Sequence, residues 1–98
     1  MTIKKEQNGN EMTMELEGRL DTTTAPELEA ELKEALTGLT ALTFDLSKLE
    51  YISSAGLRVL LSAQKVMNKQ GSMSVKGANE TILEVFEVTG FSDILTLI

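Results

Sequence analysis

The stretch Asp45-Leu-Ser-Lys-Leu-Glu-Tyr-Ile-Ser-Ser-Ala-Gly-Leu-Arg-Val-Leu60 decides how this chain folds. An apolar segment ends at Ile52, two serines follow with a small residue and a glycine, and apolar residues then recur at helical spacing. The hydroxyls of Ser53 and Ser54 are therefore expected where a helix begins. Backbone N–H groups point outward there and the helix dipole favours negative charge, so this position tolerates an added anion.

A serine at the start of a helix has two interpretations. Serine is among the preferred N-cap residues, because its oxygen accepts a hydrogen bond from an early helical N–H group. An exposed serine hydroxyl at this position is also a candidate acceptor for a regulatory phosphate, which would make Ser54 a switch. Capping is the more usual role, and from chemistry alone both interpretations stay open.

An antiparallel hairpin is expected at the beginning of the chain. Residues 3–7 and 11–17 flank Asn8-Gly9-Asn10, and Asn-Gly favours a type I′ turn because both central residues need positive φ. Met12, Met14 and Leu16 alternate with polar residues, which is the period of a half-buried strand.

The rest of the chain alternates helices with strands. Thr24-Ala-Pro-Glu27 predicts a capping box for a helix that ends near Thr37, before Gly38. The later expected elements are a strand over 41–45, a helix from about Ser54 to about Gln70 stopped by Gly71, a strand over 72–76, a helix capped by Asn79 and closed by Gly90, and a short strand or turn over 94–98.

This order predicts an α/β fold, β-β-α-β-α-β-α, as a single domain over residues 1–98. Strands that alternate with helices pair in parallel through right-handed crossovers. We therefore expect a single-layer mixed, largely parallel sheet with three or more helices, to which the N-terminal hairpin adds an antiparallel edge.

Composition excludes several classes of function. The 98 residues include 15 acidic and 9 basic ones, a net charge of −6 without a basic cluster, which argues against nucleic-acid binding. The chain has no cysteine and no histidine, so thiolate chemistry, the usual general base and the commonest metal ligand are absent. No metal, cofactor or catalytic residue is expected. No apolar run suggests a membrane span or a signal peptide, which predicts a cytoplasmic protein.

Asp21 and Asp45 are candidate site carboxylates. Asp21 precedes the first expected helix and Asp45 ends an apolar strand, and sites gather at the carboxyl ends of parallel strands. Two neighbouring carboxylates would suit acid–base work or a hard cation. The more usual role of each is to tie down a loop by accepting hydrogen bonds from backbone N–H groups.

The middle helix carries too many apolar residues for one narrow stripe. It is expected either to be buried on more than one face, which is the more usual outcome, or to present apolar surface to a partner. The residues are Leu57, Val59, Leu60, Leu61, Ala63, Val66 and Met67.

Three separated motifs resemble the STAS domain, the fold of bacterial anti-sigma factor antagonists. Asp45-Leu46-Ser47 together with residues 52–57 is similar to the family signature. Residues 18–26 are similar to the family's loop before the first helix, and Val88-Thr89-Gly90-Phe91 is similar to the turn after the last one. The motifs span nearly the whole chain in the family's order.

The resemblance implies a partner-switching function. The unmodified domain would bind an anti-sigma factor serine kinase and so release a sigma factor, and phosphorylation of Ser54 by that kinase would end the interaction. A serine phosphatase is a further implied partner. The better known antagonists carry aspartate where this chain has Ser53, so Ser53 stays open as the alternative acceptor. The implied partner-binding residues are Asp21, Thr22, Thr23, Ser53, Ser54, Ala55, Gly56 and Leu57.

Two other functions remain open. The same fold could be a non-phosphorylated subunit of a larger assembly, such as a lipid-transport complex or a signalling scaffold, that docks through the middle helix. An enzyme built on Asp21, Asp45 and the serines ranks last, because no base of suitable pKa is evident. We expect a monomer or weak dimer that is not an enzyme and binds neither nucleic acid nor membrane.

Overall fold

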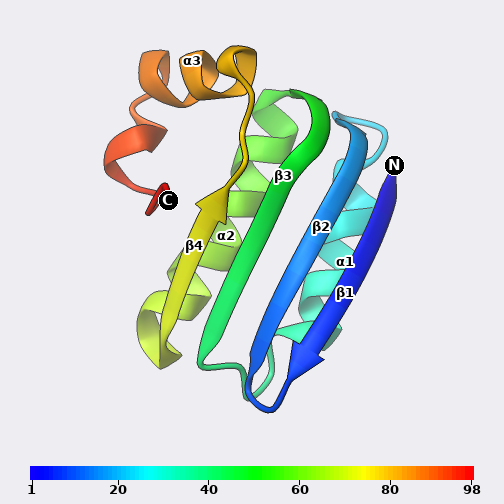
Figure 1. The fold of residues 1–98 in the computed structure, drawn as a ribbon, viewed down its shortest axis with the longest axis vertical. Coiled ribbons are helices and arrows are strands. Elements are labelled where there is room, and N and C mark those ends of the chain that lie inside the picture. Colours follow the sequence, from blue (N-terminus) through cyan, green and yellow to red (C-terminus); the bar gives the residue numbers. More distant parts are fainter.

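One four-stranded sheet in the order β1-β2-β3-β4 forms the centre of the computed structural model, which describes residues 1–98 (Figure 1). Strand β1 is antiparallel to β2, whereas β2, β3 and β4 are parallel to one another. The predicted mixed, largely parallel sheet with an N-terminal hairpin is therefore confirmed. The strands are β1 (Thr2–Asn8), β2 (Glu11–Leu20), β3 (Ala41–Ile52) and β4 (Ser72–Lys76).

Three helices follow the predicted order: α1 (Ala25–Ala35), α2 (Ser54–Gln70) and α3 (Glu80–Val88). Figure 1 shows α1 and α2 behind the sheet and α3 at the end where β2, β3 and β4 finish. A short 3-10 turn comes next, and Leu97 then pairs with Val75 at the free edge of β4. The expected terminal strand over 94–98 is thus a single bridge.

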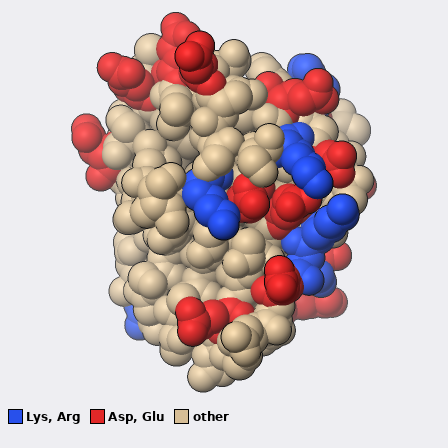
Figure 2. All heavy atoms as spheres, in the orientation of Figure 1, with Lys and Arg blue, Asp and Glu red and all other residues tan.

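The core lies between the sheet and the helices. The predicted alternation along β2 is confirmed, because Met12, Met14 and Leu16 are all buried. Phe44 of β3 and Phe86 of α3 are fully buried. The opposite face of the sheet is open and carries lysine or arginine side chains interspersed with acidic ones (Figure 2).

The hairpin turn differs from the predicted type. Asn8 pairs with Glu11, so the two-residue loop is Gly9-Asn10 rather than Asn8-Gly9. Gly9 has a φ of 64°, and no residue other than glycine has a positive φ. A type I′ turn would need positive φ at both central residues, whereas glycine at the first one alone is the pattern of type II′.

Strand β3 is longer than predicted, because it continues from Asp45 to Ile52. Beyond Asp45 it pairs only with β2, and the register shifts twice, between Glu15 and Glu17 and between Gly18 and Arg19. Each shift places an extra residue in β3, as in a β-bulge. The buried residues of this part therefore do not alternate, and the pattern of a strand is lost from the sequence.

The capping box predicted at the start of α1 is wrong. Thr24 makes no side-chain cap; its hydroxyl donates to the Arg19 carbonyl at 2.8 Å and accepts from the Asp21 N–H at 2.9 Å. The helix also ends at Ala35, earlier than predicted, and Gly38 lies in the following turn with a φ of 79°. The predicted cap of α3 is confirmed, because Asn79 Oδ1 accepts from the Ile82 N–H at 2.8 Å.

Candidate functional site

The loop after β2 and the first turn of α2 lie at the same end of the sheet. Leu20 and Ile52 are paired at the ends of β2 and β3, and the Ser53 N–H donates to the Leu20 carbonyl at 2.9 Å. Thr22 and Ala55 line one shared hollow of about 220 Å³. The fold therefore brings together the two segments predicted as the site, residues 21–23 and 53–57.

The two serines at the start of α2 have different environments. Ser53 is the N-cap, half-buried, and its Oγ accepts from the Gly56 N–H at 3.4 Å. Ser54 is the first helical residue and is exposed, and its hydroxyl has no hydrogen-bond partner within the chain. Capping thus belongs to Ser53, while Ser54 has the free hydroxyl.

The residues after Ser54 position the turn. Gly56 is buried, and a Cβ added there would lie 2.7 Å from Leu20 Cγ and 2.9 Å from Ile52 Cγ1. Leu57 is also buried, in the core between α2 and the sheet, whereas Ala55 is half-buried at the surface. The first turn of α2 is therefore seated directly on the ends of β2 and β3, with the Ser54 side chain pointing out.

Asp21 organises the loop before α1. Its Oδ1 accepts hydrogen bonds from the Thr23 N–H at 3.0 Å and the Thr24 N–H at 3.1 Å. The Thr24 backbone bond is the largest of the effects that lower the pKa of the Asp21 carboxyl, and the nearby Arg19 acts in the same direction. The loop-tying role weighed for Asp21 is the one the structure shows.

Protonating Asp21 should loosen this loop. The pKa of its carboxyl lies below the ordinary value of 3.8, so its stabilising effect is complete above that value and is lost as pH falls through the folded pKa. An NMR titration of the Asp21 carboxyl carbon and of the Thr23 and Thr24 amides should show all three changing together below 3.8. In Asp21→Asn the two amides should not titrate. A carboxyl midpoint at or above 3.8 would contradict this account.

Asp45 does not belong to the same site. Asp45 pairs with Glu15 of β2 in the sheet. Asp21 follows Glu15 by six residues, which corresponds to about 20 Å along an extended strand, so the two aspartates are far apart. Asp45 Oδ1 accepts from the Ser47 N–H at 3.0 Å, and this bond is the main reason that the pKa of its carboxyl is lowered. The idea of two neighbouring carboxylates is wrong, because β3 does not end at Asp45. The structure contains no cluster of acidic side chains that could hold a metal ion.

Arg19 and Tyr51 are neighbours of the site that the sequence did not indicate. The Arg19 guanidinium carbon lies 4.4 Å from the centre of the Tyr51 ring, and Arg19 Nε is 3.8 Å from Asp21 Oδ2. The contact is a cation–π interaction across paired strands. It depends on β3 reaching Ile52, so the shorter predicted strand gave no reason to expect it.

Most of the apolar residues of helix α2 are buried, as the more usual interpretation expected, but they lie on one side of the helix and not on more than one face. Its core residues include Leu57, Leu60 and Met67, whereas the Val66 side chain is 40% exposed at a groove that separates α2 from α1. None of the helices is both long enough and apolar enough to cross a membrane.

A family model described as "Mlab, STAS domain" matches residues 3–97 of this α/β sheet domain. The chain belongs to the STAS domain family, which confirms the resemblance found in the sequence. It is 41% identical over 81 residues to a putative anti-sigma factor antagonist, BtrV, of Bordetella bronchiseptica, covering 81% of this chain and 70% of that protein.

Two further comparisons agree. The anti-sigma-B factor antagonist of Bacillus subtilis is 28% identical over 98 residues, which cover 99% of this chain and 90% of the relative. The crystal structure of an anti-sigma factor antagonist from Mycobacterium paratuberculosis superposes with a TM-score of 0.89 at 25% identity, covering 98% of this chain and 83% of that one. Antagonists of this family are regulatory proteins and not enzymes.

Proposed function

We propose that this protein is an anti-sigma factor antagonist that binds an anti-sigma factor serine kinase and is released when that kinase phosphorylates Ser54. The observation that supports the proposal best is the exposed, unpartnered Ser54 hydroxyl at the first residue of α2. The relatives named as anti-sigma factor antagonists support the same function. A serine phosphatase would restore the unmodified form. The chain would act in the cytoplasm as one domain, without a cofactor.

The physical basis of the switch is a charge that the domain tolerates and the complex does not. A phosphate adds roughly −1.5 to −2 charges. At a helix N-terminus an anion is stabilised by about 0.3–1 kcal/mol, and the first turn of α2 carries no acidic residue to oppose it. Within an interface the same group must lose its water and repel acidic neighbours. The fold therefore persists while the complex dissociates.

The proposed binding surface surrounds Ser54. Asp21 holds the loop that presents the exposed Thr22 and Thr23, and Ala55 borders the same hollow as Thr22. Ser53, Gly56 and Leu57 belong to the surface only indirectly, since one caps the helix and the other two are buried beneath it. We assign these three residues to positioning Ser54, not to contact with the kinase.

Phosphorylation by the cognate anti-sigma factor kinase, followed by mass mapping, tests the residue assignment. Ser54→Ala should abolish the modification and leave stability almost unchanged. Ser53→Ala should still be modified but should lose up to about 1 kcal/mol of unfolding free energy, because the cap is Ser53. Phosphate on Ser53 would overturn the assignment, and no phosphate on either serine would overturn the switch.

The second candidate function is a non-phosphorylated subunit of a larger assembly. The exposed Val66 beside the groove between α1 and α2 is the observation that favours it. A wild-type protein that no kinase modifies, and that co-purifies with other subunits through this helix face, would support the second candidate over the first.

A further inference from the structure

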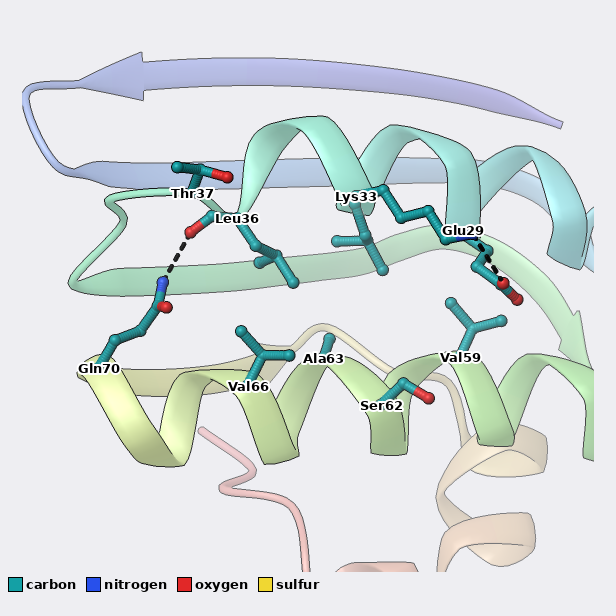
Figure 3. A pocket seen from close by; sticks show the side chains of 10 residues that line it. Glu29, Lys33, Leu36, Thr37, Val59, Ser62, Ala63, Val66 and Gln70 are labelled. Carbon is teal, nitrogen blue, oxygen red and sulfur yellow. Dashed lines mark hydrogen bonds and ion pairs between the residues drawn. The ribbon is translucent and has the colours of Figure 1, made fainter.

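A groove runs between α1 and α2 on the side of the molecule away from the open sheet face (Figure 3). It encloses about 430 Å³. A second hollow shares Glu29, Val59 and Ser62 with it and extends it toward the N-terminal ends of both helices. At the other end the Gln70 side-chain amide closes it by donating to the Leu36 carbonyl at 2.6 Å. The apolar lining is Leu32, Leu36, Val59, Ala63 and Val66.

The two helices that border this groove carry opposite charge. Helix α2 has Arg58, Lys65 and Lys69, all exposed, and no acidic residue. Helix α1 has four glutamates and one lysine. Two of the glutamates are paired within the chain, because Glu29 contacts Lys33 at 3.8 Å and Glu31 contacts Lys5.

The other two glutamates of α1, Glu27 and Glu34, are exposed and make no salt bridge, although the charge of Glu34 also acts on Lys5. They are seven residues apart, as are Arg58 and Lys65 on α2, so each pair lies along one side of its helix. The two helices run parallel to each other. Residues that line the groove together therefore show which positions lie side by side along the helix axes: Glu29 lies beside residues 59–62, and Leu36 beside residues 66–70 (Figure 3). Glu27 is thus about level with Arg58, and Glu34 with Lys65.

We propose that this helix face pairs with the same face of a second copy of the chain. A two-fold axis parallel to the helices would place α1 of one copy over α2 of the other without changing their heights. Glu27 would then face Arg58 of the second copy, and Glu34 would face Lys65. A two-fold axis perpendicular to the helices would instead oppose helices of like charge. Two-fold dimers are the commonest oligomers, and their surface must be complementary to itself, as this one is.

The contribution of each part of the face follows from its exposure. The half-exposed Val66 and the groove lining supply apolar surface that a second copy would cover. The exposed charge pairs add little affinity each, but they fix the register and the orientation. The dimer should therefore be weak and should dissociate further as salt is raised. The proposal does not depend on phosphorylation of Ser54.

Exchanging the charges tests this arrangement. In E27K/E34K both helices become basic, and in R58E/K65E both become acidic. Sedimentation velocity over about a hundredfold range of concentration should show self-association of the wild type, weakened by about tenfold or more in each variant. An equimolar mixture of the two variants should associate again, because every pair across the interface is then opposite in charge.

Two control variants match the changes in net charge on other surfaces. K4E/K76E alters exposed lysines of the sheet, and E84K/E87K alters exposed glutamates of α3; both should associate like the wild type. Circular dichroism of every variant confirms that it is folded. A wild type that stays monomeric throughout, variants that still associate fully, or a mixture that fails to associate would each overturn the proposal.

Discussion

Replacing Ser54 with aspartate is expected to weaken binding to the anti-sigma factor kinase by about a hundredfold while leaving thermal stability nearly unchanged. The new carboxylate sits at the first residue of α2, where the helix dipole favours it and the first turn of the helix carries no acidic residue to oppose it. In the complex the same carboxylate must be desolvated against the kinase, which costs far more than exposure in the free domain. The phosphorylated wild type, with the larger charge, should bind more weakly still.

Ser72→Asp is the matched control for that measurement. Ser72 is an exposed serine at the start of β4, at the opposite end of the sheet from Ser54, so the same charge is added away from the proposed surface. Isothermal titration calorimetry with the kinase should give wild-type affinity for this variant. Equal affinities for Ser54→Asp, the phosphorylated protein and the wild type would show that charge at Ser54 is not the switch.

The start of α2 was predictable because all of its determinants are local. The apolar run before Ile52, the serine pair and the helical spacing after it lie in one stretch, and the bounds of α2 agree with the prediction. The division of roles between Ser53 and Ser54 was not predictable. It depends on the extended backbone of Ser53, which the pairing of Leu20 with Ile52 and the Ser53 N–H bond to Leu20 impose.

The errors arose where contacts between distant segments override local pattern. The bulges of β3 follow from its pairing with β2, so the strand beyond Asp45 shows no alternation and the distance between Asp21 and Asp45 was misjudged. Likewise, the Thr24 hydroxyl has a local capping pattern but bonds instead to the Arg19 carbonyl at the end of β2. The charges of α1 and α2 are evident in the sequence. That the acidic positions of α1 lie beside the basic positions of α2 along the helix axes is evident only from the structure, in which both helices pack on the same face of the sheet.

Gly71 was correctly placed at the end of α2, but the reason it must be glycine is steric. Its φ of 173° is extended backbone that any residue can adopt. A Cβ added there, however, would lie 1.9 Å from the Thr40 carbonyl oxygen and 2.6 Å from its carbon. Thr40 cannot easily retreat, because its carbonyl accepts from the Ser72 N–H at 3.0 Å and its own N–H donates to the Asn10 carbonyl at 2.8 Å.

Gly71→Ala is therefore expected to lower the free energy of unfolding by about 3 kcal/mol, at the upper end of the usual cost of overpacking. Gly38→Ala is the informative comparison, because Gly38 has a φ of 79° but nothing within 4 Å of an added Cβ. Gly38→Ala should therefore lower the free energy of unfolding only by the cost of placing alanine in a left-handed conformation, about 1–2 kcal/mol. Urea unfolding of both variants separates the two causes. If Gly71→Ala costs no more than Gly38→Ala, the close approach of α2 to Thr40 does not constrain the fold.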